Sequence, residues 1–338
     1  MNPLVVGMIG VWGFGGYRRE RMRETGLFKI AAVCDRNEEA LSKVAAEEGA
    51  SAYSDFDAML AHPGLEAVVI STGADSHAQF AIAAMRRGLH VFVEKPLCTS
   101  VAEVAALREA ARETGKVVGL GHKHCASEPF LILAKRYIDE GRLGTVVCFE
   151  DNSSHSGGLE IQAGDWRGLA ERNPGGMLFQ CGVHELNALA FLFGPPVSVQ
   201  SMMRYNANSN TETADAANVL LRYSGGLVGT LSCYHVTPYI HELRIFGTKG
   251  ALYFDTFDKK GWFQERKRQE IESREPLEIP QASPDHDCAN LVSWFEGIRS
   301  NKPVYPALED GIQAVLPVFA AEIADKERRE VEISRMSP

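Results

Sequence analysis

The fold of the N-terminal part is decided by residues 4–24, which read LVVGMIGVWGFGGYRRERMRE. The apolar run at residues 4–9 predicts a β-strand, and the charged stretch at residues 14–24 predicts a helix. Between them lies a glycine-rich turn that begins at Gly10. Backbone N–H groups and the helix dipole in such a turn attract a pyrophosphate, so this arrangement favours dinucleotide binding. The alternative is a tight strand-to-helix turn that binds no ligand.

The alternation of strand and helix continues to about residue 120. Apolar strands are predicted at 30–34, 67–71, 90–93 and 117–120, with a short one at Tyr53, and helices at 38–48, 56–60, 76–87 and 101–114. Continuous Val and Ile runs between helices are typical of a parallel sheet that is covered on both faces. Because crossovers between parallel strands are right-handed, we expect an α/β doubly wound Rossmann domain at residues 1–122.

The pattern changes after residue 122. We expect a helix at 130–140, a strand at 145–150, a polar and glycine-rich stretch at 151–176, and a helix that begins near Val183 and stops at Gly194. Apolar residues then alternate with polar ones at 197–205, 217–223, 227–234, 242–246 and 251–254, and two helices follow at 288–300 and 309–325. Alternation with period two predicts strands with one buried face. We therefore expect a second, α+β domain at residues 123–338, built on a large, mostly antiparallel open sheet.

The charge balance and the cysteines limit the possible partners. The 338 residues include 35 Lys and Arg against 44 Asp and Glu, a formal net charge of −9, whereas nucleic acid and anionic membranes attract positively charged proteins. No apolar stretch approaches the ~20 residues of a membrane span, and the N-terminus lacks the basic start of a signal peptide. The seven cysteines are scattered, which is typical of a reduced compartment. We expect a cytoplasmic protein with no nucleic-acid or membrane partner.

The spacing in the glycine turn departs from the dinucleotide-binding motif. In Gly-x-Gly-x-x-Gly counted from Gly10, the third glycine is Gly15, but the middle position is Trp12 and a glycine follows it at Gly13. Trp12 must therefore point away from the pyrophosphate, or the cofactor must shift. Phe14 completes the stretch that we expect to line the cofactor.

An acidic residue follows the second predicted strand. Asp35 stands 25 residues after Gly10, where a carboxylate accepts hydrogen bonds from the adenine ribose. It could also cap the helix at 38–48, and the two roles are compatible. A carboxylate at this position repels a 2′-phosphate, which favours NAD, although Arg36 beside it leaves NADP possible.

Two further stretches follow predicted parallel strands at their carboxyl ends, where open α/β sheets bind their ligands. The first is Ile70–Ser–Thr–Gly–Ala–Asp–Ser–His77, and the second is Val91–Phe–Val–Glu–Lys–Pro96. Partial burial of the Lys95 side chain would lower its pKa and prepare it for proton transfer or hydrogen bonding. The alternative for Lys95 is an ion pair with Glu94 at the end of the strand.

Together these stretches resemble the Gfo/Idh/MocA family, named after glucose–fructose oxidoreductase, inositol dehydrogenase and a rhizopine-catabolism protein. The resemblance continues through Gly175–Gly–Met–Leu–Phe–Gln–Cys–Gly–Val–His184, Asn301–Lys–Pro303 and Glu309–Asp–Gly311, and so spans essentially the whole chain. It implies a Rossmann domain, a C-terminal domain on a large open sheet, NAD or NADP as cofactor, and a sugar, inositol or related polyol as substrate. It also implies a homodimer or homotetramer that assembles through the C-terminal sheet.

The resemblance implies roles for single residues as well. Lys95 matches the lysine between nicotinamide and substrate, and His184 matches the histidine that takes the proton from the reacting hydroxyl. Gln180 stands where the family usually has Asp or Asn, and a glutamine can orient His184 or hold a substrate hydroxyl but cannot exchange a proton. The residues implied to line the cofactor are Ser71, Thr72, Gly73, His77, Glu94 and Lys95, with Gly73 in place of the family's usual proline.

Elementary chemistry agrees with these roles. Hydride leaves a carbinol carbon only as its hydroxyl proton is removed, so the site needs a base and a group that stabilises the developing oxyanion. An imidazole is a suitable base near neutral pH, and a lysine ammonium can stabilise the oxyanion. We therefore expect His184 as base, Lys95 as electrostatic clamp and Gln180 as positioning residue.

The polar stretch at 151–176 adds substrate contacts. Asp165, Trp166 and Arg167 place an aromatic face between two charges, which suits a sugar ring, although Trp166 could equally anchor the loop to the core. His122, His124 and His155 show no second cluster with ligand spacing, so we expect no metal.

Two other functions stay open at this point. One is a glycoside-modifying enzyme that oxidises a sugar position, eliminates or epimerises, and then reduces the product again. The other is a catalytically inactive NAD-binding regulatory protein. Trp12 and Gln180, which depart from the family pattern, favour this alternative, and the presence of both Lys95 and His184 argues against it.

Overall fold

The computed structural model describes residues 2–267 and 273–336, and the chain divides into two compact units. Unit 1 comprises Met1–His124 together with Pro284–Ile312, and unit 2 comprises Cys125–Ser283 together with Gln313–Pro338. The segment 284–312 thus groups with the first unit, whereas the sequence pattern suggests the second domain for it. The packing of this segment explains the difference.

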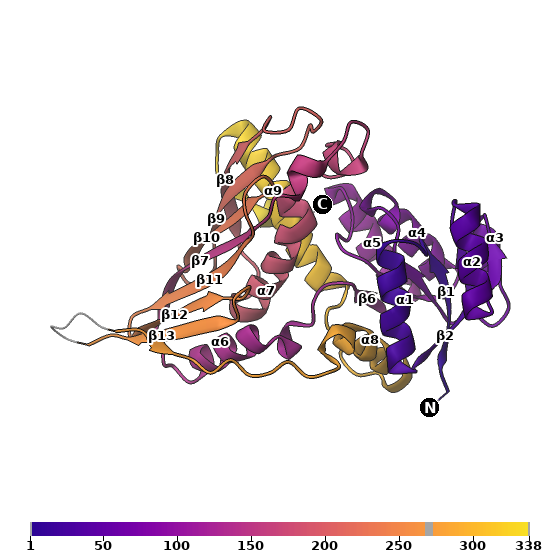
Figure 1. The fold of residues 1–338 in the computed structure, drawn as a ribbon, viewed down its shortest axis with the longest axis horizontal. Helices are drawn as coiled ribbons and strands as arrows, with labels where there is room; N and C mark the ends of the chain where they lie inside the picture. The colour runs from indigo at the N-terminus through magenta and orange to yellow at the C-terminus, as the bar shows by residue number, and fades with distance from the viewer. Residues whose placement is uncertain (1, 268–272, 337–338) are drawn as a thin grey trace. The chain divides into compact units, whose positions relative to one another are not determined.

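Unit 1 is built on a six-stranded parallel sheet with the order β3-β2-β1-β4-β5-β6 (Figure 1). The strands are β1 (Leu4–Ile9), β2 (Phe28–Cys34), β3 (Ser51–Tyr53), β4 (Ala67–Ile70), β5 (His90–Val93) and β6 (Val118–Leu120). The connecting helices are α1 (Phe14–Thr25), α2 (Glu38–Glu48), α3 (Phe56–Leu60), α4 (Ala74–Arg86) and α5 (Val101–Thr114). The expected doubly wound Rossmann sheet is confirmed. Its strand order reverses between β1 and β4, so ligands are expected at the carboxyl ends of these strands.

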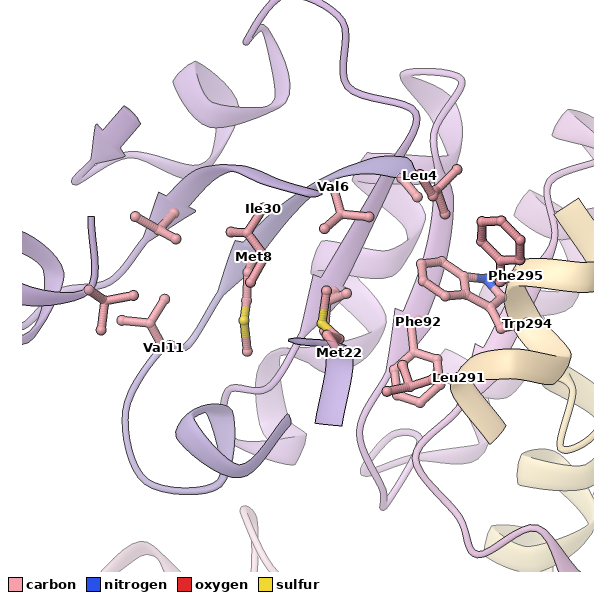
Figure 2. Packing of buried hydrophobic residues seen from close by; sticks show 14 of the residues in the cluster. Leu4, Val6, Met8, Val11, Met22, Ile30, Phe92, Leu291, Trp294 and Phe295 are labelled. Carbon is pink, nitrogen blue, oxygen red and sulfur yellow. The ribbon is translucent and has the colours of Figure 1, made fainter. Parts of the chain in front are cut away.

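The core of unit 1 includes a helix from late in the chain, α8 (Ala289–Ser300). Figure 2 shows Leu291, Trp294 and Phe295 of this helix in one buried cluster with the apolar residues of β1. Trp294 is fully buried, and a Cβ on Gly119 of β6 would lie only 2.7 Å from its indole ring. Each large apolar side chain buried in this way contributes about 1.5–3 kcal/mol. Hydrophobic packing therefore ties 284–312 to unit 1.

Unit 2 is built on a nine-stranded sheet with the order β14-β13-β12-β11-β7-β10-β9-β8-β15. The strands are β7 (Val146–Ser154), β8 (Ser198–Arg204), β9 (Ala216–Arg222), β10 (Val228–Tyr234), β11 (Ile240–Gly247), β12 (Gly250–Asp255), β13 (Lys260–Glu265), β14 (Glu275–Pro276) and β15 (Val331–Glu332). The longer helices are α6 (Pro129–Asp139), α7 (Val183–Phe193) and α9 (Leu308–Glu327), of which α9 belongs to unit 2 from Gln313 onward. The mostly antiparallel sheet expected from the sequence is confirmed, although β7 and β10 pair in parallel.

The sheet of unit 2 is larger than the sequence pattern predicts. The pattern does not predict β13, nor the edge strands β14 and β15, which are only two residues long and pair through backbone groups. Strand β7 continues to Ser154, into the stretch expected to be irregular. Two 3₁₀ turns, Gly157–Glu160 and Trp166–Gly168, also lie in that stretch.

The two faces of this sheet differ in character. Phe149, Leu231 and Ile245 are buried, and a Cβ on Gly182 would lie 2.9 Å from Cys233 Sγ of β10, so the start of α7 packs against the buried face. Exposed positions that alternate with the buried ones include Met202, Leu220, Val228, Asn218, Glu150 and Arg244. Among the helices of residues 2–267 and 273–336, none is both long and apolar enough to cross a bilayer.

Candidate active site

The glycine turn after β1 is shaped by two glycines that admit no side chain. Gly10 has φ 80°, and a Cβ there would lie 2.6 Å from the backbone oxygen of Ser71. A Cβ on Gly15 would collide with the carbonyl oxygen of Gly10. At Gly13, by contrast, φ is 57° and a Cβ would meet no atom within 4 Å. Gly10 and Gly15 therefore make the turn tight. Gly13 leaves open space at the N-terminus of α1, where a ligand could come close to the protein backbone.

The tryptophan in the middle of the motif does not fill this turn. The Trp12 side chain is 59% exposed, and the Lys43 Nζ of α2 lies 5.6 Å from the centre of its ring. Phe14 is also exposed, and its ring lies 5.1 Å from that of Tyr17. Trp12 thus points outward, beside α2, which is the orientation that pyrophosphate binding requires of it.

Asp35 links the end of β2 to the glycine turn. Its Oδ2 accepts a hydrogen bond from the Val11 N–H at 2.9 Å, and its Oδ1 accepts one from the Asn37 N–H at 3.0 Å. The N-cap of α2 is Asn37, whose side chain accepts from the Ala40 N–H, so the alternative role of Asp35 as helix cap is wrong. A carboxylate offers about four acceptor positions, which leaves positions on Asp35 for ribose hydroxyls. Arg36 beside it is exposed.

The segment after β4 lies against the glycine turn. The Ser71 N–H donates to the Ile9 carbonyl at 2.9 Å, and the Thr72 and Ser76 hydroxyls lie 2.7 Å apart. Gly73 precedes α4 in an extended conformation. The Ser71 Oγ is buried and has no hydrogen-bond partner within the part of the chain that the structure describes. A buried hydroxyl in this state is expected to have a ligand or water partner, which fits a polar ligand between Ser71 and the glycine turn.

His77 takes a different position from the one expected of a cofactor contact. Its ring is buried, with Nδ1 2.7 Å from the Pro96 carbonyl oxygen and Nε2 3.0 Å from the Thr72 carbonyl oxygen. Burial lowers the pKa of His77, and the two carbonyl groups oppose that change. The imidazole therefore connects the backbone after β4 with the backbone after β5.

Glu94 and Lys95 lie at the carboxyl end of β5. The Glu94 carboxylate is buried and pairs with Arg18 of α1, whose Nε lies 2.6 Å from Glu94 Oε1. Asn290 extends the network, since its Oδ1 accepts from Arg18 Nη1 at 3.3 Å and its amide donates to the His122 carbonyl at 2.8 Å. Lys95 is half-buried between buried neighbours. The acidic partner proposed for Lys95 at the sequence level is thus engaged by an arginine.

His122 belongs to the surroundings of Lys95. Burial, and then the positive charge of Lys95, lower the pKa of His122 to about 3, so the ring is neutral. Arg18 and Asn290 were missed by sequence reasoning, and His122 was considered only as a metal ligand. His122 could have been found, because it follows β6 and the carboxyl ends of parallel strands meet at one edge of the sheet. In residues 2–267 and 273–336, no three His, Cys, Asp or Glu side chains are grouped so that they could hold a metal ion.

In unit 2, Gln180 and His184 lie where a π-helical turn, Leu178–Gly182, runs into α7. The preceding glycines fix this turn: the Gly175 N–H donates to Glu322 Oε1 at 2.7 Å, and a Cβ on Gly176 would collide with the carbonyl oxygen of Ala214. Gln180 and His184 are half-buried, whereas residues 177–179 are buried. Single π turns inside helices are frequent at functional sites.

A buried acidic group lies next to this turn. Glu185 Oε1 is 3.2 Å from His241 Nε2, and Asp151 of β7 is buried with an Oδ1 that has no hydrogen-bond partner among the described residues. Burial, and then the charge of Glu185, raise the pKa of Asp151. The buried Asp151 carboxyl therefore binds its proton more tightly than an exposed aspartate does.

Two further histidines lie beside Cys181. His155 Nε2 is 3.7 Å from Cys181 Sγ, and the rings of His155 and His235 are 5.0 Å apart. Because the Gly157 N–H donates to His155 Nδ1 at 2.8 Å, the neutral ring carries its proton on Nε2 and donates toward the sulfur. Burial, and then His155 and Arg167, lower the pKa of His235 to about 4.

Asp165, Trp166 and Arg167 border a shallow, open depression of the surface, together with Ala163, Gly164 and Arg172. The Arg167 Nε lies 3.1 Å from both carboxylate oxygens of Asp165, and this pairing lowers the pKa of Asp165. Trp166 is half-buried. The structure therefore places the expected cofactor residues of unit 1 at the carboxyl ends of the parallel strands, and the expected substrate residues of unit 2 at the π turn and at this depression.

Comparison with known proteins gives the same family in both parts of the chain. Residues 4–122 match the family model described as "Oxidoreductase family, NAD-binding Rossmann fold", and residues 131–253 match the "GFO/IDH/MocA C-terminal domain". The scyllo-inositol 2-dehydrogenase (NAD(+)) of Bacillus subtilis is 28% identical over 68% of this chain and 66% of its own length. The myo-inositol 2-dehydrogenase of Thermotoga maritima is 22% identical over 98% of this chain and 99% of its own.

Solved structures share the whole fold. Levoglucosan dehydrogenase in complex with NADH and levoglucosan superimposes with a TM-score of 0.87, at 20% identity over 98% of this chain and 100% of that one. At this identity the likeness concerns the arrangement of strands and helices, in both the parallel and the antiparallel sheet.

Proposed function

The chain belongs to the Gfo/Idh/MocA family of NAD-binding oxidoreductases, and on this premise we propose that it transfers hydride between a nicotinamide and a carbinol carbon of a sugar, inositol or related polyol. The observation that carries the proposal is the meeting of three features at the carboxyl ends of β1, β2 and β4: the glycine turn, which lies against the Ser71 backbone, Asp35, which accepts from the Val11 N–H of that turn, and the buried Ser71 hydroxyl. When bound there, the nicotinamide supplies the hydride acceptor or donor.

The residues present fit a dinucleotide. Gly13 leaves space at the N-terminus of α1, where backbone N–H groups would hold the pyrophosphate. Asp35 would accept hydrogen bonds from the adenine ribose, and Ser71, Thr72 and Gly73 would line the cofactor from the end of β4. The carboxylate at 35 supports NAD, and exposed Arg36 is the residue that would accommodate a 2′-phosphate.

We propose that His184 accepts the proton of the substrate hydroxyl and that Lys95 stabilises the negative charge that develops on the same oxygen. On oxidation, the substrate hydroxyl proton passes to the His184 imidazole while the hydride leaves the carbinol carbon. The Lys95 ammonium stabilises the alkoxide character of that oxygen. Its positive charge adds to the burial that lowers the pKa of His122. Gln180 holds a substrate hydroxyl or orients His184, and it exchanges no proton.

The polyol class is supported by what the relatives are named for. Two act on inositols by name, another is named D-apiose dehydrogenase, and the solved relative holds levoglucosan. The ring face of such a substrate is apolar and its rim is polar, which suits Trp166 between Asp165 and Arg167. These three residues would then contact substrate hydroxyls and the ring.

A second candidate is a reaction with no net redox change, in which a sugar is oxidised, altered and reduced again. It is favoured by a relative named 2,7-anhydro-N-acetylneuraminate hydratase, 27% identical over 80% of this chain and 72% of its own length. A cofactor that co-purifies and does not exchange would distinguish this reaction from simple dehydrogenation.

The proposal is tested by cofactor and substrate titration. A ligand at 100 times its Kd stabilises the native state by about 2.7 kcal/mol, so NAD⁺ or NADH should raise the melting temperature clearly. A panel of inositols and sugars is then followed at the nicotinamide absorbance. Lys95→Ala and His184→Ala should each lower kcat by about 100-fold or more, whereas His286→Ala, at a partly exposed histidine in the 3₁₀ turn before α8, should not. Turnover within a few fold of wild type in both site variants would contradict the assigned roles.

A further inference from the structure

His77 occupies a position that the proposed chemistry does not use directly. It lies on α4 with only 1% of its surface exposed, and each ring nitrogen faces a backbone carbonyl oxygen. Carbonyl oxygens only accept hydrogen bonds, so both contacts require the ring to donate. A neutral imidazole has one N–H and makes one of these bonds, whereas an imidazolium makes both.

The two carbonyls belong to segments that follow two different strands. Thr72 lies in the turn after β4 that would line the cofactor, and Pro96 directly follows Lys95 after β5. These strands are neighbours in the sheet, and Ile70 pairs with Val93 at their ends. The His77 ring thus bridges the cofactor-lining turn and the lysine turn at the place where both strands end.

Lys95 is fixed from its other side as well. The preceding residue, Glu94, is paired with buried Arg18 at 2.6 Å. A Cβ on Gly121 would collide with the Glu94 carboxylate, so Glu94 is closely packed on that side. Glu94, before Lys95, is therefore held by buried Arg18, and Pro96, after it, is held by buried His77. Lys95 itself is half-buried between them.

We propose that His77 is a positioning residue that sets the place of the Lys95 ammonium relative to the cofactor-lining turn, through its Nδ1–H bond to the Pro96 carbonyl and its Nε2 contact with the Thr72 carbonyl. The inference rests on the proposed function, because it gives His77 a role in the chemistry assigned to Lys95. Reaction rates are sensitive to such placement, since a displacement of about 1 Å can cost about 100-fold.

The groups that face His77 determine the balance between its neutral imidazole and its protonated imidazolium form. Burial lowers the pKa of His77, while the Pro96 and Thr72 carbonyls, Glu94 and Asp75 raise it. In the neutral form, the shorter contact, 2.7 Å from Nδ1 to Pro96, is the one that takes the proton. The lysine turn is then held at all pH values, and the cofactor-lining turn is held more firmly in the imidazolium form.

Two conservative variants separate the two contacts. The amide nitrogen of an asparagine reaches about as far as imidazole Nδ1, and that of a glutamine about as far as Nε2. His77→Asn should keep the bond to Pro96 and lose the one to Thr72, whereas His77→Gln should do the reverse. His77→Phe loses both. His90→Phe is the matched control, because His90 is a partly buried histidine of the same sheet that accepts from the Val117 N–H at 3.0 Å.

The readouts are the Kd for NADH by fluorescence, the rate at which an amine-directed reagent labels Lys95, followed by peptide mass spectrometry, and kcat on the polyol. Because the neutral ring donates to Pro96 alone, we expect His77→Asn to keep the Kd, Lys95 labelling and kcat within about threefold of wild type near neutral pH. The Kd of this variant should rise above that of wild type only at acidic pH, where the wild-type imidazolium also donates to Thr72. We expect His77→Gln to leave the Kd unchanged, to accelerate Lys95 labelling and to lower kcat about 10- to 100-fold. The His90→Phe control should lose stability only.

The result that would overturn the proposal is equal behaviour of His77→Asn and His77→Gln in Kd and labelling, with melting temperatures that show both to be folded. Equal changes in His77→Phe and His90→Phe would overturn it too. NADH binding and Lys95 labelling need no turnover, so a wild-type protein that oxidises no polyol would contradict the proposed function and still allow the positioning role to be measured.

Discussion

In unit 1 the Arg18 Nε lies 2.6 Å from Glu94 Oε1, and both side chains are almost completely buried. The guanidinium also lies over the Phe92 ring, 4.8 Å from its centre. This pair connects α1, which starts at the glycine turn, to the residue before Lys95. One buried charge pair therefore connects the helix that begins at the glycine turn with the segment that carries Lys95.

Removing one member of this pair should be more harmful than removing both. Arg18→Met leaves the Glu94 carboxylate buried without its counter-charge, which typically costs about 3–5 kcal/mol of unfolding free energy. The double variant Arg18→Met with Glu94→Leu should recover a large part of that loss. Denaturant unfolding measures both. Arg244→Met, which breaks a surface pair with Glu150, is the control and should cost about 0–1 kcal/mol. A double variant no more stable than Arg18→Met would contradict this account.

Asp151 should make stability fall as pH rises. Burial, and then Glu185, raise its folded-state pKa above the unfolded value of about 3.9. The native state therefore binds the proton more tightly, and its contribution to stability is complete below the unfolded pKa and is lost as pH rises through the folded pKa. Asp151→Asn should remove this loss, so the stability of the variant relative to wild type should increase as the pH rises above about 3.9. Urea unfolding at several pH values measures it, with exposed Asp139→Asn as control, and a pH-independent difference would argue against a proton on Asp151.

Asp35 should decide the preference between the two cofactors. Asp35→Asn keeps an acceptor for the Val11 N–H but removes the negative charge that repels a 2′-phosphate. The ratio of the Kd for NADPH to that for NADH should fall by about tenfold or more, as a single charge contact of this kind is worth about 1–2 kcal/mol. Arg36→Ala should move the ratio the opposite way. Calorimetric titration gives both dissociation constants. An unchanged ratio in Asp35→Asn would show that the Asp35 carboxylate does not determine the preference between NADH and NADPH.

The exposed face of the unit 2 sheet should mediate self-association. Met202 is 80% exposed and Leu220 52%, on neighbouring strands β8 and β9, and exposed apolar side chains gathered on one face mark an interaction surface. We expect a dimer or tetramer by light scattering, and Leu220→Arg should shift it toward the monomer. Ile132→Arg is the control, since Ile132 is exposed on helix α6 and not on a strand of the sheet. A monomeric wild-type protein at micromolar concentration would contradict the prediction that this face mediates self-association.

The strands of unit 1 were predictable because most of them contain an apolar run, as in Ala67–Ile70, where every residue is buried. The edge strand Val331–Glu332 was not, because two residues carry no pattern and the pairing with β8 is made by backbone groups. The grouping of 284–312 with unit 1 depends on Trp294 meeting Gly119, a contact between residues far apart in the sequence that no local pattern encodes.

The candidate site was predictable where strand ends locate it. Asp35, Ser71 and Lys95 each follow a parallel strand, and the structure places them accordingly. Arg18 could not be found this way, because it stands in the run Arg18–Arg–Glu–Arg21, which has the composition of a solvated helix face. Its burial is determined by Glu94 and Asn290, 76 and 272 residues further along the chain.

The packing of α8 has a consequence for how this protein can be divided. The chain passes between the two units at 124–125, 283–284 and 312–313. A fragment that ends at residue 124 would contain every strand of the Rossmann sheet but would lack Leu291, Trp294 and Phe295, and Gly119 would face solvent instead of an indole ring. The cofactor-binding half is therefore not a transferable N-terminal module. A swap between relatives would have to exchange both of its segments together.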